Sequence, residues 1–253
     1  MLAEAFALDA GEAQRLVDEL LDGSEGTRRF SLHLAGPDDA AARLSLQVVA
    51  DVFLDAFGND ADLLREHYAA LLPAMTHLTV LDRVTRTAIG SVVLQTAPAE
   101  ELKTVVDLAG EPWSIPADDA LAALGVARGD RTSADLLLVA VHPAYRKVGL
   151  AQLLLYAAYV LSVQRGTHRW TAILDEPLRW GMNELTHGAL HPIGGATTQP
   201  YLGSTASTPI TLRMDPETDV ALFRRIARAG GAASEHVDFC AELEAGHRAF
   251  QTV

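Results

Sequence analysis

Apolar and polar residues along this chain follow two alternating patterns, short apolar stretches and longer stretches of helical period, which together predict an α/β protein. Apolar runs over residues 136–141 and 169–174 have the length of buried strands, and the run over residues 153–163 has that of a buried helix. Ahead of these runs the pattern predicts an amphipathic helix over residues 1–22, a strand at 29–34 and a helix that is capped by residues 36–39 and ends at about residue 57. A further helix, capped by Asn59, ends at about residue 72, and two strands follow at 77–81 and 88–94.

Longer segments flank and interrupt this core. We expect a single domain over residues 1–253. It has an N-terminal helical extension (residues 1–25), an insertion before the strand at 136–141 (residues 97–134) and a C-terminal helical extension (residues 215–253). Within the insertion the pattern predicts helices at 100–108 and 117–124. The insertion either lies on the substrate side or packs Trp113 and Ile115 onto the core as a surface elaboration. After residue 174 the pattern predicts a helix at 177–188 and two strands at 196–202 and 208–214. Two helices follow at 216–229 and 235–250.

Composition narrows the classes of partner. The 253 residues are 49% hydrophobic, which suffices for a full core, and the single cysteine, Cys240, excludes an intrachain disulfide. The formal net charge of −13 disfavours sequence-independent binding of DNA or RNA, which needs a basic surface. Because the N-terminus lacks a basic leader and no apolar run is long enough to span a membrane, we expect a soluble cytoplasmic protein with no membrane partner.

The junction between the strand at 136–141 and the helix at 153–163 has the features of an anion site. Gly149 lets the main chain approach a bulky anion, and a helix N-terminus there presents unpaired N–H groups and the positive end of the helix dipole. Arg146 and Lys147 add local positive charge to a chain that is negative overall. These residue types predict a phosphate or pyrophosphate ligand.

Arg146-x-x-Gly149-x-Ala151 resembles the Gln/Arg-x-x-Gly-x-Gly/Ala signature of GNAT-type N-acyltransferases, which bind acyl-coenzyme A. The resemblance covers roughly residues 135–166, through Val139-x-Val141-x-Pro143-x-Tyr145-Arg146 before the signature and Leu153-Leu154-Leu155 after it. It implies the α/β GNAT fold, a mixed central sheet with splayed middle strands, flanked by helices. The alternative is an ordinary strand-to-helix turn in which Gly149 serves only tight packing.

The resemblance also implies which residues bind the co-substrate, acetyl-CoA or another acyl-CoA. The backbone of Val139 and Val141 would pair with the pantetheine arm, and the Val141 N–H would face the thioester oxygen. The side chain of Asn183 would reach the pantetheine. The pyrophosphate would bind the turn, at Arg146, Lys147, Val148, Gly149, Leu150 and Ala151.

The general acid is where the chain departs from the family pattern. The stretch from Asn183 resembles the family's Asn-x-x-Ala-x-x-Leu-Tyr, but Leu190 stands at the tyrosine position and cannot protonate a thiolate. His187, His191, Tyr201 or a water would have to replace the tyrosine. Otherwise the thiolate departs unassisted, or the chain binds acyl-CoA without transferring the acyl group.

Candidates for the general base are Asp82, His142, Asp175 and Glu176. Each has a competing structural role, because Asp82 suits a solvated turn, His142 can face solvent, and Asp175 and Glu176 suit the acidic first turn of a helix.

A metal site is not expected. His187 and His191 have the spacing of metal ligands on a helix, but Gly188 and Pro192 argue against a continuous helix there.

The reaction predicted from this sequence is transfer of an acyl group, by default acetyl, from acyl-CoA to a primary amine of a small molecule, by direct attack in a ternary complex. Residues 200–214 resemble the subset of the family that uses long acyl chains, so a long-chain N-acyl amino acid synthase-like enzyme is the alternative. A third hypothesis is that the chain is a non-catalytic acyl-CoA-binding module. An acyl carrier protein is not favoured as donor, since it is acidic like this chain, and a homodimer is left open.

Overall fold

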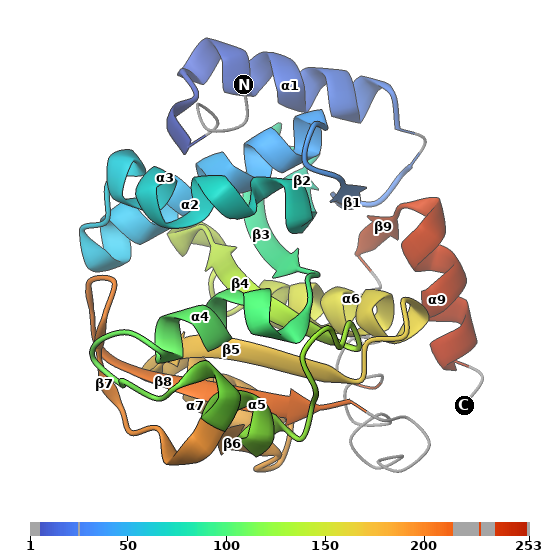
Figure 1. The fold of residues 1–253 in the computed structure, drawn as a ribbon. Coiled ribbons are helices and arrows are strands. Elements are labelled where there is room, and N and C mark those ends of the chain that lie inside the picture. The colour runs from blue at the N-terminus through green and yellow to red at the C-terminus, as the bar shows by residue number, and fades with distance from the viewer. Residues whose placement is uncertain (1–5, 25, 215–227, 229–235, 252–253) are drawn as a thin grey trace. The chain divides into compact units, whose positions relative to one another are not determined.

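The computed structural model describes residues 6–24, 26–214, 228 and 236–251. The chain divides into two compact units (Figure 1). The first holds the described residues within Met1–Leu94, Leu138–Leu161 and Ala227–Val253, and the second those within Gln95–Leu137 and Ser162–Ile226. The expectation of a single domain stays a prediction. Among the described residues, no helix is long and apolar enough to cross a membrane.

The first unit is built on a sheet whose strands follow the predicted order. Strand β1 (Phe30–Ala35) pairs antiparallel with β2 (Met75–Asp82), from Phe30 opposite Asp82 to Ala35 opposite His77. Strand β3 (Thr87–Gln95) lies next to β2, and the short β9 (Val237–Phe239) pairs parallel with the other edge of β1. The sequence pattern predicted helix where β9 begins, because three residues are too few to show a strand period.

Helices pack on both faces of this sheet. Ser91 of β3 bonds to Ser45 of α2 at 2.5 Å, whereas a Cβ on the adjacent Gly90 would lie 3.0 Å from Leu154 of α6. Because neighbouring strand residues face opposite sides, α2 and α6 cover opposite faces of β3. The helices of the first unit, with the start of α6, are α1 (Ala10–Asp22), α2 (Ala40–Phe57), α3 (Ala61–Tyr68), α6 (Leu150–Gln164) and α9 (Ala241–Gln251).

Capping residues set where two of these helices begin. The Asp9 carboxylate accepts the Glu12 N–H at 2.8 Å, so α1 starts at Ala10 and the predicted helix over residues 1–22 is wrong for residues 6–9. The predicted cap of α3, Asn59, is also wrong, because Asp60 accepts the Leu63 N–H at 2.9 Å. Beyond Tyr68 the chain continues as a 3₁₀ helix, Ala69–Ala74.

The second unit is built around a pair of long antiparallel strands. Strand β5 (Arg169–Asp175) pairs antiparallel with β8 (Ser204–Arg213) and parallel with the start of β4 (Ser133–Val141). The short strands β6 (Leu190–Pro192) and β7 (Gln199–Tyr201) both pair with β8. The predicted strand at 196–202 is therefore shorter than expected, and the helix predicted at 216–229 lies outside the described residues apart from residue 228.

The insertion at 97–134 has a core of its own. It contains a 3₁₀ turn (Ala99–Glu101) and the helices α4 (Lys103–Leu108) and α5 (Ala117–Leu124). Outside the insertion, helix α7 (Glu176–Leu185) packs on β5 and β8. Trp113 and Ile115 pack, partly buried, against this core. Its buried members are Ala97, Ala99, Leu102, Val105, Leu108, Ala120, Leu121 and Leu124 from the insertion, with Ile193 and Ala196.

Candidate functional site

The segment that joins β4 to α6 is a tight turn with two left-handed residues. After β4 ends at Val141, a 3₁₀ turn (Pro143–Tyr145) is followed by a turn in which Lys147 has φ 70° and Gly149 has φ 84°. Glycine adopts this conformation at no steric cost, whereas in lysine the Cβ atom makes it unfavourable in energy. The turn therefore holds its backbone in a conformation that the signature glycine permits.

The N-terminus of α6 presents unpaired N–H groups. The first helical bond is donated by Leu153 to the Gly149 carbonyl at 3.0 Å. The N–H groups of Leu150, Ala151 and Gln152 precede that bond, so they have no acceptor within the helix. Together with the positive end of the helix dipole they form a cradle of donors suited to an anion. We call this segment, residues 146–152, the donor turn.

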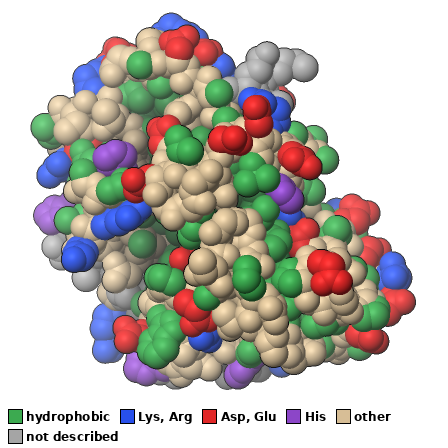
Figure 2. Space-filling model, turned by 90° about the vertical axis from the view of Figure 1, so that its left-hand side faces the viewer, with side chains coloured by type: hydrophobic (Ala, Val, Ile, Leu, Met, Phe, Trp, Pro, Cys, Tyr) green, Lys and Arg blue, Asp and Glu red, His purple; other side chains and the backbone are tan. Residues whose placement is uncertain are grey.

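Positive charge lies on the donor turn and is not neutralised. The side chains of Arg146 and Lys147 are exposed, and neither forms an ion pair within the part of the chain that the structure describes. Arg146 Nε donates to the Val141 carbonyl at 3.3 Å, which directs the guanidinium along the turn. Elsewhere, the face in Figure 2 carries scattered acidic side chains and no continuous basic patch.

Asp82 anchors the donor turn to the sheet. Its buried carboxylate accepts from Arg29 at 2.8 Å, from the Val84 N–H at 2.8 Å and from the Tyr145 hydroxyl at 3.0 Å. Burial alone would raise the pKa of Asp82, but these bonds outweigh it and lower the pKa below the usual value. A carboxylate held in this way is a poor base, so the contacts of Asp82 favour a structural role.

His142 opens the turn. Its exposed ring accepts the Ala144 N–H at Nδ1, at 3.3 Å, and its backbone N–H bonds to the Ile89 carbonyl at 2.9 Å. The ring therefore caps the 3₁₀ turn.

The pairing of β4 with β5 ends early. The register runs from Ser133 opposite Arg169 to Asp135 opposite Thr171 and stops there, although β4 continues to Val141. Beyond this point Val139 and Val141 are half-buried and lie on the same side of β4, because strand residues alternate. The backbone groups of β4 beyond Asp135 are therefore not paired with β5, and the splayed middle strands stay a prediction.

Glu176 is fully engaged in hydrogen bonds. Its two oxygens accept from Arg179 at 2.9 and 2.8 Å, from Trp180 Nε1 at 2.8 Å and from Thr208 at 3.2 Å. Hydrogen bonding to Arg179, above all, lowers the pKa of Glu176 to about 2 despite partial burial. Like Asp82, it is held in its ionised form and favours a positioning role for the start of α7.

The remaining predicted residues lie on α7 and after it. The half-buried side chain of Asn183 has no hydrogen-bond partner among the described residues. His187 is exposed in the turn after α7, with φ 52°, and His191 is exposed on β6. Leu190, at the family's tyrosine position, is buried on β6 opposite Leu212.

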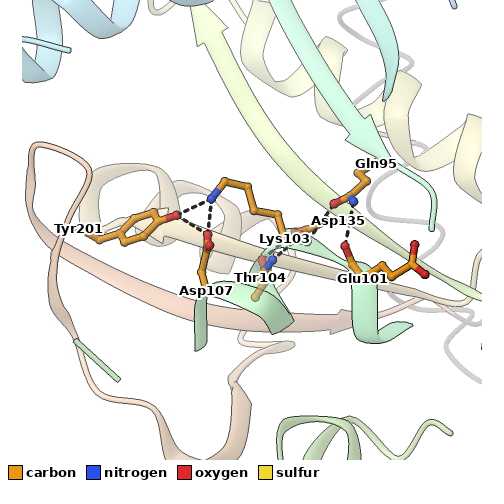
Figure 3. Close-up of polar contacts among 7 residues, drawn as sticks. All are labelled: Gln95, Glu101, Lys103, Thr104, Asp107, Asp135 and Tyr201. Carbon is orange, nitrogen blue, oxygen red and sulfur yellow. Dashed lines mark hydrogen bonds and ion pairs between the residues drawn. The ribbon is translucent and has the colours of Figure 1, made fainter. Parts of the chain in front are cut away.

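Asp135, which sequence reasoning missed, is the most unusual carboxyl of the second unit. It is 1% exposed and lies at the last paired position of β4 and β5. Its oxygens accept from the Thr104 N–H at 2.5 Å and the Thr104 hydroxyl at 2.7 Å (Figure 3). Burial raises the pKa of Asp135 to about 7, against these two bonds. The available signal was an acidic residue directly before an otherwise uncharged apolar run.

A second polar cluster lies beside it in the same unit. Lys103 Nζ donates to Asp107 at 2.5 Å and to the Tyr201 hydroxyl at 3.0 Å, and that hydroxyl donates to Asp107 (Figure 3). The Trp113 ring packs against Tyr201 with centroids 5.3 Å apart. These contacts fasten α4 of the insertion to β7, and they bring Tyr201, one of the predicted acids, next to a lysine.

Solved structures identify the fold. A protein from Lactobacillus plantarum assigned as an N-acetyltransferase aligns at a TM-score of 0.50 and 12% identity, over 73% of this chain and 99% of its own. The CoA-dependent acyl-homoserine lactone synthase BjaI, solved with SAM and isopentyl-CoA, aligns at a TM-score of 0.50 and 14% identity, over 88% of this chain and 100% of its own. The chain has a GNAT-type fold.

This finding confirms the predicted fold class, an α/β GNAT-type fold with a mixed sheet flanked by helices. BjaI solved with MTA gives the same result, at a TM-score of 0.51. No protein-family model matches the sequence, and no curated protein does. Among the described residues, no group of three histidine, cysteine or acidic side chains is arranged to hold a metal ion.

Replacing Asp135 with asparagine is expected to change how stability depends on pH. The pKa is about 7 in the folded protein and about 3.9 in an unfolded chain. The stability that this group contributes is therefore complete below about pH 4 and is lost as the pH rises through about 7. Over that range the unfolding free energy of the wild type should fall relative to that of D135N, by up to about 4 kcal/mol.

Urea unfolding of both proteins from pH 4.5 to 8 measures this difference. Taking the difference removes the opposite trend from His33 and His77, whose pKa values burial lowers to about 4. The exposed Asp55 of α2, replaced with asparagine, is the matched control. A difference between wild type and D135N that stays constant with pH would show that Asp135 is ionised throughout.

Proposed function

We propose that this chain is an acyl-CoA-dependent N-acyltransferase that transfers an acyl group, by default acetyl, to a primary amine of a small molecule. The observation that carries the proposal is the donor turn, where free N–H groups, a helix dipole and two unpaired cations converge on a GNAT-type fold. A coenzyme A pyrophosphate has the charge and the acceptor oxygens to match these donors. The half-buried edge of β4 offers backbone groups for the pantetheine arm.

The reaction is a single displacement in which the amine nitrogen bonds to the thioester carbonyl carbon and the carbon–sulfur bond breaks. The Val141 N–H is the proposed donor to the carbonyl oxygen, where negative charge develops. A base must take one proton from the attacking nitrogen, and the leaving thiolate then takes up one proton. Leu190 supplies no acid, so the proton for sulfur comes from another side chain or from water.

His142 is the proposed base. It directly follows Val141, and its ring is exposed. Its Nδ1 accepts the Ala144 N–H at 3.3 Å, so this nitrogen holds the lone pair and takes up a proton once that long bond is given up. The strongly ionised Asp82 and Glu176 are poor bases. Asp135 has a pKa of about 7, but it is buried and lies six residues before Val141 on the same strand, about 20 Å away, so it does not reach the attacking amine.

Two further activities belong to this proposal as alternatives. BjaI, by its name, makes acyl-homoserine lactones from CoA donors, and its likeness covers 88% of this chain, which favours testing longer acyl groups. The buried Leu190 favours testing for binding without transfer. Thiol release from acetyl-, butyryl-, octanoyl- and palmitoyl-CoA with a panel of amines separates the three, and tight binding with no release from any pair favours the binding module.

Arg146→Ala is expected to weaken acetyl-CoA binding by about 5- to 30-fold, because it removes a charge-assisted contact to the pyrophosphate. Affinity for S-acetylpantetheine, which lacks the pyrophosphate, should not change. Isothermal titration of both ligands measures the two effects. The exposed Arg131→Ala is the matched control and should bind both ligands as the wild type does. Equal losses for both ligands would place the pyrophosphate elsewhere.

His142→Gln is expected to lower kcat by about 100-fold with little change in KM, because an amide cannot take up the proton. Initial rates of thiol release across a range of acetyl-CoA concentrations measure kcat and KM. The exposed His168→Gln is the matched control and should keep the wild-type kcat. A wild-type kcat in H142Q would show that His142 is not the base.

A further inference from the structure

A pocket of about 270 Å³ opens in the first unit beneath the N-terminal helix α1. None of its lining residues is predicted from the sequence to act in the reaction, although the lining residue Asp51 is close enough to His142 to feel its charge. Helix α1, helix α2 and the start of β3 each supply part of the lining. The lining residues are Ala10, Ala13, Gln14, Val17, Leu44, Gln47, Val48, Asp51, Arg86, Thr87 and Ala88.

The walls of this pocket are apolar and well supported. Val17 and Leu44 belong to the buried cluster that fastens α1 to α2, and Ala13 and Ala88 pack against that cluster. Small side chains such as Ala13 leave the space open. The volume is just below the roughly 300–1,000 Å³ of pockets that hold drug-sized molecules, so the pocket fits a short hydrocarbon chain or a small ring.

One carboxylate in the pocket lining, that of the exposed Asp51, is in no ion pair within the described part of the chain. Asp51 accepts from Gln47 Nε2 at 2.7 Å and forms no ion pair with any described residue. The cation in the lining, Arg86, cannot neutralise it, because its Nε bonds to Asp18 at 2.7 Å and its Nη2 to Asp22 at 3.0 Å. Asp51 is exposed at the pocket mouth; burial on its pocket side raises its pKa, while the Gln47 bond and the charge of His142 act in the opposite direction.

We propose that this pocket is a binding site for a small organic cation, a primary ammonium group carried on a short hydrocarbon chain. The ammonium bonds to Asp51, and the hydrocarbon lies against the wall formed by Ala13, Val17 and Leu44. Both halves of such a ligand are matched, because the carboxylate gains the positive partner it lacks and the chain leaves water for an apolar wall. The proposal does not depend on acyl transfer.

Amide chemical shifts of the ¹⁵N-labelled protein, recorded without acyl-CoA, test the site. The probes are n-butylammonium chloride, n-butanol and sodium butyrate at constant ionic strength. We expect n-butylammonium to shift the amides of Gln47, Asp51 and Thr87 and to bind with a Kd of about 1–10 mM, as suits a ligand of this size. Butanol should bind about tenfold more weakly and butyrate not measurably.

Two substitutions locate the binding. Asp51→Asn should weaken n-butylammonium binding about tenfold and leave butanol binding unchanged. Asp55→Asn, one turn further along α2 and outside the lining, is the matched control and should change neither. Ala13→Leu should fill the pocket and abolish binding of both probes. Equal binding of n-butylammonium and butanol, equal effects of D51N and D55N, or no shifts at these amides would overturn the proposal.

Discussion

The unsatisfied backbone donors at the start of α6 are the feature on which the rest of this account depends. A helix N-terminus cannot bond its first N–H groups internally, and here it follows a turn with left-handed residues at Lys147 and Gly149. The turn is held by a chain of contacts from Arg29 through Asp82 to Tyr145, which ties it to β1 and β2. The cradle is therefore preorganised by the sheet.

Environment gives three carboxyls of this chain different roles. Asp82 and Glu176 each meet a guanidinium and several further donors, so their pKa values are lowered and their charges serve to position the turn and the start of α7. Asp135 is buried and accepts from Thr104, and the charge of Asp107 lies near it, so its pKa rises to about 7. The charges of Asp82 and Glu176 are therefore constant near neutral pH, whereas that of Asp135 changes there and makes the packing of the insertion depend on pH.

Local patterns in the sequence were sufficient for the long elements and for the turn. The helix expected at 117–124 is α5, and the strand expected at 29–34 is β1 shifted by one residue. The short strands β6 and β9 were missed because three residues cannot display a period. Asp135 was missed for another reason: its role depends on burial beneath Thr104, a contact made only when the insertion folds back onto β4. Sequence spacing carries no information on such a long-range contact.

The most direct test of the donor turn is the response of its own amides to coenzyme A. Titration of the ¹⁵N-labelled protein with coenzyme A, followed by amide ¹H–¹⁵N spectra, should move the signals of Val148, Gly149, Leu150, Ala151 and Gln152 more than those of any other segment, with downfield proton shifts as new hydrogen bonds form. If coenzyme A binds and these signals stay in place, or if it does not bind, the anion site described here is wrong.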